Sequence, residues 1–184
     1  MSRLIMTVIG VLLLVSCASA GAIKQRDGWV VIDSNQPYAA LVQRLEAAVK
    51  TENMGFVTSA SASEGAKAAG VAIPGNRIVG VFRNDFARRM LSASISAGIE
   101  APIRFYITEN PGGMATLSYK KPSYVFTPYF DEGGDVLRAV ADELDGIFAR
   151  IADTTTKKTI TRTLLSREER SVGLSTSARG CSAR

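Results

Sequence analysis

The spacing of apolar residues changes repeatedly along the middle of the chain, and this limits it to folds that mix helices and strands. Apolar residues recur at helical spacing over 38–49 and over 136–151, which predicts two helices with one buried face each. Short β-prone runs lie before the first of them, at 29–32, and between the two, at 56–59 and 78–82. No regular strand–helix–strand repeat is present. The sequence therefore predicts a compact single α+β domain, in which helices pack an antiparallel or mixed sheet.

Caps and turns predict where the first helices begin and end. Ser34 is expected to cap a helix that has Pro37 in its first turn, and Gly55 is suited to ending it. Residues 63–69 are typical of a short capped helix. A further helix follows the 78–82 strand, with Asn84 or Asp85 as its cap; its expected apolar face includes Phe86, Met90 and Leu91.

A β-hairpin is predicted in the second half of the chain. Its strands are 103–107 and 115–119, and the Asn-Pro-Gly-Gly sequence at 110–113 makes the turn. Residues 124–126 either extend this hairpin or form a loop that covers it. The last predicted helix has the clearest amphipathic pattern of the chain, and its expected buried face comprises Val136, Leu137, Val140, Ala141, Leu144, Ile147, Phe148 and Ile151.

Polar and aromatic side chains at the strand ends form the candidate binding site. Alternation along the first hairpin strand places Phe105 and Ile107 on one face and Arg104 and Tyr106 on the other. Donors and aromatic rings that converge there would suit an anionic or polar ligand. The alternative is an exposed sheet face with ordinary cross-strand pairs. The candidate residues are Arg83, Asn84, Arg104, Tyr106, Tyr119 and Lys120.

The residue types present exclude several kinds of catalysis. The chain has no histidine, which removes the commonest metal ligand and the usual base for nucleophile activation. Asp131, Glu132 and Asp135 lie close together before the last helix and have the oxygen ligands of a hard cation. The favoured interpretation is a charged helix entry, stabilised by the helix dipole. No metal or cofactor is predicted.

The first 20 residues predict export from the cytoplasm. Arg3 precedes an apolar run from Leu4 to Val15, which is shorter than the ~20 residues of a membrane span. The Leu-Val-Ser-Cys sequence that ends at Cys17 resembles a bacterial lipobox, which implies acylation of that cysteine and a membrane anchor. Ordinary cleavage after Ala20 would instead release a soluble protein. The expected location is therefore the periplasm or outer membrane, with the protein lipid-anchored or secreted.

Charge distinguishes the predicted domain, residues 28–152, from a C-terminal tail, which also contains the second cysteine of the chain. Cys181 has no intramolecular partner, because Cys17 is acylated or removed. Residues 21–152 hold fourteen basic and fourteen acidic residues, whereas 153–184 hold seven basic and three acidic ones. The tail is rich in Ser and Thr, so we expect it to be flexible. It has the charge to contact an anionic envelope component, although a simply solvated tail is favoured. Nucleic acid is not an expected partner.

Several local patterns resemble a known family. They are the 38–49 helix before Gly55-Phe56, the 78–82 strand followed by Asn84, and Ala101-Pro102-Ile103-Arg104 leading through Gly113 to Tyr119 and Pro122. Over about Val30 to Ala152 the chain resembles the domain of unknown function 302 family. The resemblance implies a compact α+β domain and leaves a homodimer open. It implies no established activity and no catalytic residues.

These observations favour a non-enzymatic binding or interaction module of the bacterial cell envelope, with an unidentified ligand. The alternative is a small envelope hydrolase or isomerase that uses carboxylates. Such an enzyme would need a concave pocket holding at least one Asp or Glu with a raised pKa.

Overall fold

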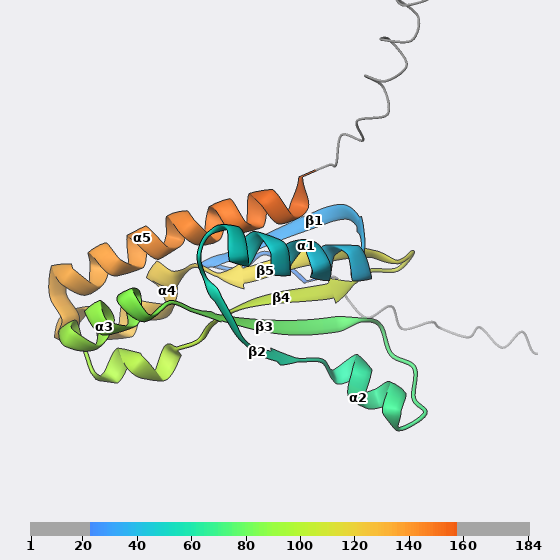
Figure 1. The fold of residues 1–184 in the computed structure, drawn as a ribbon, viewed down its shortest axis with the longest axis horizontal. Helices are drawn as coiled ribbons and strands as arrows, with labels where there is room; N and C mark the ends of the chain where they lie inside the picture. Colours follow the sequence, from blue (N-terminus) through green and yellow to red (C-terminus); the bar gives the residue numbers. More distant parts are fainter. Residues whose placement is uncertain (1–22, 158–184) are drawn as a thin grey trace, which may run out of the picture.

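The computed structural model describes residues 23–157 (Figure 1). The predicted export segment with Cys17, and the part of the predicted tail from residue 158 onward with Cys181, lie outside the described residues. The elements are β1 (Trp29–Pro37), α1 (Tyr38–Thr51), β2 (Gly55–Ala60), α2 (Ala62–Ala68), β3 (Asn76–Phe82), α3 (Asn84–Ala93), η1 (Ser96–Glu100), β4 (Ile103–Glu109), β5 (Met114–Lys120), α4 (Pro122–Phe126), η2 (Thr127–Tyr129) and α5 (Phe130–Thr156).

The five strands form one sheet in the order β1-β5-β4-β3-β2, and each neighbouring pair is antiparallel. The predicted α+β class is confirmed, and the sheet is antiparallel rather than mixed. The predicted hairpin corresponds to β4 and β5, and its turn closes through a 3.0 Å hydrogen bond from Gly113 N to Asn110 O. Gly112 and Gly113 both have positive φ (92° and 82°), a backbone conformation that favours glycine.

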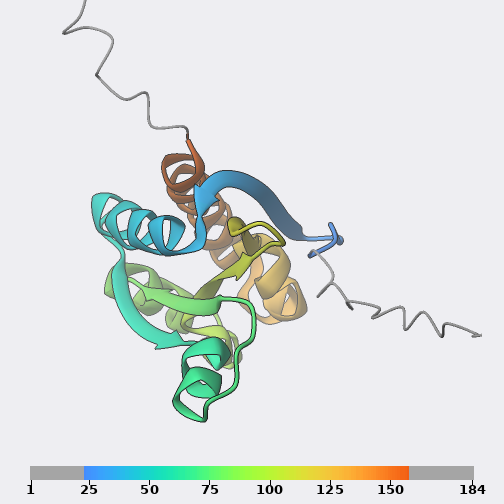
Figure 2. The same cartoon turned by 90° about the vertical axis from the view of Figure 1, so that its right-hand side faces the viewer.

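One face of the sheet is covered by α1 and α5, which lie on the same side of it in Figure 1. Figure 2 shows α1 beside the C-terminal part of α5. The helical spacing of apolar residues predicted the buried faces of both helices. Fully buried residues on these faces include Leu41, Leu45, Leu137, Val140 and Phe148. Phe105 of β4 stacks on Phe148 with 4.5 Å between ring centroids. Among residues 23–157, no helix combines the length and apolarity required to span a membrane.

The predicted boundaries of α1 are wrong at both ends. Ser34 lies within β1 and is buried, and its Oγ accepts a hydrogen bond from Gln36 N instead of capping a helix. The helix begins at Tyr38, directly after Pro37, because strand pairing with β5 holds the chain extended up to that proline. It ends at Thr51, before Gly55, and Asn53 adopts a positive φ (55°) in the connection to β2.

Two later segments also differ from expectation. No side chain caps α3; Arg83 precedes it, and Leu91 is exposed while Phe86 and Met90 are buried. Residues 124–126 belong to α4, which packs on α5 and is neither a strand nor a covering loop. Pro122 stands in the first turn of α4, a position that proline favours.

The last helix is longer than predicted. It begins at Phe130, is interrupted at Gly134 (φ 54°), and continues to Thr156. Val136 is 57% exposed, so it does not belong to the buried face that its spacing indicated. The helix also passes the predicted domain end at Ala152. Its last turn is fixed to α1, because Arg44 donates to the carbonyls of Thr154, Thr155 and Lys157 at 3.0, 2.7 and 2.7 Å.

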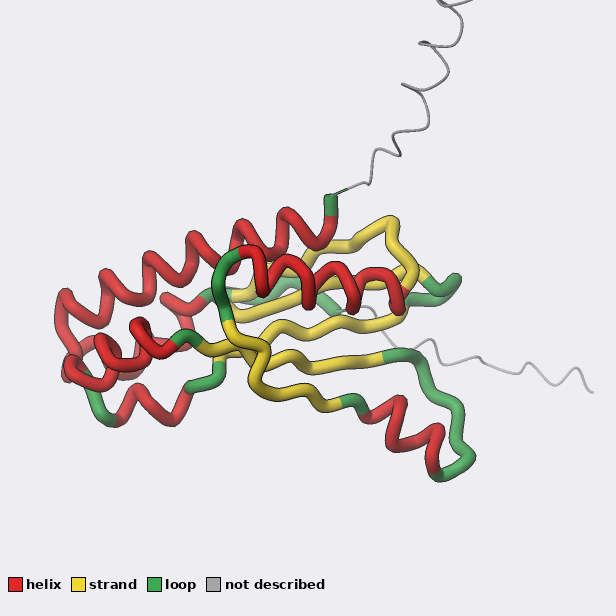
Figure 3. Tube along the Cα trace, in the orientation of Figure 1, coloured by secondary structure: helices red, strands yellow, loops and turns green. Residues whose placement is uncertain are grey.

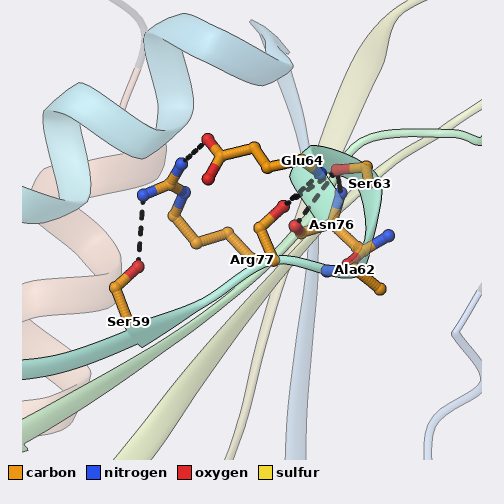
Figure 4. A network of polar contacts seen from close by, with 7 residues as sticks. Ser59, Ala62, Ser63, Glu64, Asn76 and Arg77 are labelled. Carbon is orange, nitrogen blue, oxygen red and sulfur yellow. Dashed lines mark hydrogen bonds and ion pairs between the residues drawn. The ribbon is translucent and has the colours of Figure 1, made fainter. Parts of the chain in front are cut away.

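The short helix α2 projects beyond the sheet in Figure 3 and buries no side chain. The predicted helix begins one residue early, and Ser61 caps it, since Ser61 Oγ accepts from Glu64 N at 3.1 Å. Polar contacts attach it to β3 (Figure 4). Asn76 Oδ1 accepts from Ala62 N at 2.9 Å, and Arg77 pairs with Glu64. Since α2 buries no side chain, hydrogen bonds and an ion pair with β3 contribute to holding it in place.

Candidate functional site

A hollow of about 590 Å³ lies beside β4 and β5, where these strands approach α4 and η2. Arg104 and Tyr106 reach it from the sheet face opposite the helix layer, since their neighbours Phe105 and Ile107 are fully buried in the core. The register of β4 with β5 sets Tyr106 opposite the small Ser118, which also lines the hollow. A large side chain opposite a small one leaves space above the strands.

The wall nearest β1 consists of aromatic rings. Trp29 lies opposite Lys120 in the register of β1 with β5, and both residues line the hollow. The Trp29 ring has Arg26 at 5.5 Å and Lys120 at 5.7 Å from its centroid. Such cation–π contacts keep positive charge beside an aromatic surface. Arg26 does not line the hollow itself, so the wall combines a flat apolar surface with the positive charge of Lys120.

Gly28 allows Tyr124 of α4 to complete this wall. A Cβ at position 28 would lie 2.0 Å from Tyr124 Cγ, and Gly28 has a positive φ of 73°. Both observations require glycine, because a side chain would collide with the ring and strain the backbone. Lys121 N donates to Gly28 O at 2.8 Å, so the start of β1 and the end of β5 are fixed together. Tyr124 remains 46% exposed.

The hollow carries more positive than negative charge. Arg104 and Lys120 line it, and neither forms an ion pair with any residue of the described range 23–157. Glu100 supplies the negative charge, and its Oε1 accepts a 2.9 Å hydrogen bond from the Tyr129 hydroxyl. That hydrogen bond raises the pKa of Tyr129. Two cations that form no ion pair within residues 23–157, beside one carboxylate that already accepts a hydrogen bond, make the hollow suited to an anion.

Comparison with protein families gives a match to the model described as domain of unknown function DUF302, over residues 30–153. The chain belongs to the DUF302 family. The crystal structure of an uncharacterized conserved protein DUF302 from Bacillus stearothermophilus is similar to it, with a TM-score of 0.62 and 19% sequence identity. The similarity covers 71% of this chain and 99% of that one, and at this identity it concerns the fold alone. Among curated proteins, no sequence matches the chain.

In this DUF302 domain three of the six candidate residues lie together on the hollow without a role in the core: Arg104, Tyr106 and Lys120. Whether they bind a ligand stays a prediction. Arg83 and Asn84 do not line the hollow. Arg83 donates to both carboxylate oxygens of Asp85, at 2.8 and 3.2 Å, and lies 4.2 Å from the Phe86 ring centroid. It therefore fixes the β3–α3 junction and lowers the pKa of Asp85.

Tyr119 also proves to be mainly structural. It borders the hollow, but its side of β5 faces the helices, and it is only 5% exposed. Its ring packs 5.2 Å from Phe105 and 5.5 Å from Phe148. Burial, reinforced by the charge of Asp145, raises the pKa of Tyr119 to about 12. The alternation along β5 was a usable signal, because it places Tyr119 on the same face as Ala115 and Leu117, which are both fully buried.

Of the acidic residues at the start of α5, Glu132 has structural partners. Asp131 and Glu132 lie in the first turn of the helix rather than before it. Hydrogen bonds from the hydroxyls of Ser96 and Ser94 lower the pKa of Glu132. Within the described part of the chain, no three His, Cys, Asp or Glu residues are grouped as metal ligands. The favoured interpretation, a charged helix entry, agrees with this placement.

Other residues of the hollow were not among the predicted candidates: Trp29, Glu100 and Tyr124. Trp29 is the single tryptophan of the chain and stands at the start of a predicted strand, which was a usable signal. Its position depends on the pairing of β1 with β5, which are far apart in sequence. Tyr124 depends on α4, a helix that the short 124–126 run does not predict.

Proposed function

We propose that this DUF302 domain is a non-enzymatic binding module whose hollow takes a small organic anion with a flat or apolar body. The observation that supports this most directly is that one hollow combines two cations with three aromatic rings. The cations, Arg104 and Lys120, form no ion pair within residues 23–157, and the rings are those of Trp29, Tyr106 and Tyr124. A carboxylate, sulfonate or phosphate group would meet the cations. The remainder of the ligand would lie against the rings.

Geometry and chemistry support this ligand class. The volume of about 590 Å³ falls in the range of small-molecule sites. The Arg104 guanidinium offers several donors in one plane, which matches a carboxylate or phosphate. Aromatic walls contribute by apolar burial and ring contacts, at little cost in side-chain conformational entropy. Glu100 at the rim would disfavour ligands with several negative charges.

The proposed location is outside the cytoplasm of a bacterial cell, in the periplasm or at the outer membrane. Residues 1–20 have the pattern of an export signal, and the sequence ending at Cys17 resembles a lipobox, so we propose a lipid anchor at that cysteine. The seven basic residues of 153–184 support a second, electrostatic contact with an anionic envelope component.

Binding of a model ligand tests the hollow directly. In calorimetric titrations of the exported chain, 1-naphthoate should bind more tightly than the uncharged 1-naphthylmethanol. Arg104→Ala should weaken naphthoate binding roughly tenfold, because an exposed charge-assisted hydrogen bond contributes about 1–1.5 kcal/mol. Arg88→Ala serves as the matched control, since Arg88 is exposed on α3 and does not line the hollow. Equal affinity for both compounds, or equal loss in both variants, would contradict the proposal.

A second candidate function rests on Glu100, the carboxylate that lines the hollow and accepts from Tyr129. A carboxylate-dependent hydrolase or isomerase would use this group as its general base. Glu100→Gln keeps the shape of the side chain and removes its basicity. If naphthyl ester or amide substrates turn over, this variant should abolish turnover while naphthoate binding persists. The binding-module proposal instead predicts no turnover in either protein.

A further inference from the structure

Arg26 and Lys120 lie beside the Trp29 ring at the start of β1, and Lys121 follows Lys120 along the chain. We call this set the basic corner: Arg26, Trp29, Lys120 and Lys121. Arg26 and Lys120 approach the Trp29 ring at 5.5 and 5.7 Å from its centroid. Lys121 follows Lys120 and is exposed, as are Arg26 and Lys120. None of the three cations forms an ion pair with a residue of the described range 23–157.

The backbone holds the basic corner in a fixed arrangement. Trp29 N donates to Arg26 O at 3.0 Å, and Lys121 N donates to Gly28 O at 2.8 Å. Trp29 and Lys120 are direct partners in the antiparallel register. The positive charges and the indole ring are therefore presented together before any ligand binds, which reduces the entropy cost of binding.

The sequence places this corner close to the proposed anchor. Cys17 precedes Trp29 by twelve residues, so even a fully extended chain separates the two by at most about 40 Å. A tether of that length gives a high effective concentration of the membrane surface at the corner. Contacts that would be weak between separate molecules are then sufficient.

We propose that the basic corner contacts the anionic lipid headgroups of the membrane that holds the anchor, with Trp29 at the level of the headgroups. Basic residues near an anionic leaflet each strengthen membrane binding, and tryptophan is enriched at the membrane–water interface. This inference rests on the proposed lipid anchor at Cys17. It also brings the hollow, which shares Trp29 and Lys120 with the corner, next to the membrane surface.

The single tryptophan allows a direct test. The exported Cys17→Ala chain, which carries no lipid, is titrated with vesicles of phosphatidylglycerol and phosphatidylcholine, and with phosphatidylcholine alone. Trp29 emission should shift to the blue with the anionic vesicles only, and brominated acyl chains should quench it. The double variant Arg26→Gln and Lys121→Gln should lose about 30-fold in vesicle affinity at low salt. A chain that ends at Lys157 should retain the shift.

The matched control is Lys50→Gln with Lys67→Gln, which removes the same charge from exposed positions on α1 and α2. Its vesicle affinity should change by less than about threefold, because the effect depends on proximity to the membrane. An equal loss in both double variants would overturn the inference. So would vesicle binding without any change in Trp29 emission, or a shift that inorganic phosphate reproduces and vesicles do not. The corner variant should bind 1-naphthoate nearly normally, so failure here is distinguishable from failure of the hollow.

Discussion

The two faces of the sheet differ in what their side chains contact, and consecutive residues of β4 illustrate this. Phe105 is fully buried and stacks on Phe148 of α5. Tyr106, the next residue, lines the hollow and faces Ser118 across the strands. The helix-covered face thus contains the apolar core, whereas the other face carries Arg104 and the aromatic wall. A step of one residue along the strand therefore separates a side chain that stabilises the domain from one available for binding.

This difference indicates where substitutions should act. A change on the covered face removes packing that the surrounding helices cannot replace, because protein interiors are close-packed. A change on the hollow side meets solvent, so the fold should accept it. The predictions below test this separation, and one residue, Tyr119, belongs to both regions.

The largest loss of stability is expected for Phe148→Ala. Phe148 is fully buried and contacts both Phe105 and Tyr119. Its truncation should leave a cavity between α5 and the sheet and lower the free energy of unfolding by about 3–5 kcal/mol. Urea unfolding followed by circular dichroism measures this change.

The companion substitution on the hollow side is Tyr106→Ala. We expect it to lower the free energy of unfolding by about 1 kcal/mol or less, since the Tyr106 ring is only half-buried. It should nevertheless weaken naphthoate binding, because the ring lines the hollow. Similar losses of stability in Phe148→Ala and Tyr106→Ala would contradict the division between the two faces.

The elements that sequence alone predicted best are those with a sustained apolar period. The α1 and α5 patterns extend over several turns, and the β4–β5 hairpin combines alternation with a strong turn sequence. Boundaries were less predictable because tertiary contacts set them. Ser34 has the side chain of a helix cap, yet pairing of β1 with β5 keeps it within the strand. Thr155 lies past the apolar pattern and is still fully buried.

The candidate site was predicted only in part, because tertiary contacts decide which side chains enter the hollow. Alternation within one strand placed Arg104 and Tyr106 on one face without any tertiary knowledge. Arg83 lies at a strand end, but its bond with Asp85 depends on how α3 leaves β3. Trp29 and Tyr124 enter the hollow through long-range pairing and through a glycine contact. Such contacts are not encoded in local spacing.

Removing the C-terminal end of the domain is expected to lower the free energy of unfolding by an intermediate amount. A chain that ends at Ala152 loses the fully buried Thr155 and all three carbonyls to which Arg44 is seen to donate. We expect a decrease of about 2–3 kcal/mol in the free energy of unfolding, because Arg44 is left without these acceptors. A chain that ends at Lys157 keeps these contacts. Its stability should stay within about 0.5 kcal/mol of the full chain, as measured by urea unfolding.

These two truncations separate the fold from the tail. If the chain ending at Lys157 is strongly destabilised, residues beyond 157 contribute to the domain, and the boundary must be moved. If the chain ending at Ala152 is as stable as the full chain, the last turn of α5 is dispensable and the contacts of Arg44 contribute little.

The last expected effect depends on pH and concerns Tyr119, which borders the hollow but packs in the core. Its pKa rises from 10.0 to about 12 in the folded protein, chiefly because burial disfavours the phenolate. The folded state therefore holds the phenolic proton more tightly than the unfolded chain does. The resulting stabilisation is fully present below pH 10 and decreases as the pH rises toward 12. Tyr119→Phe lacks this ionisation, so unfolding curves of the two proteins between pH 9 and 12 should show the wild type losing about 1–2 kcal/mol relative to the variant. A constant difference over this range would mean that the Tyr119 hydroxyl is hydrated in the folded protein, and Tyr119 would then belong with the hollow and not with the core.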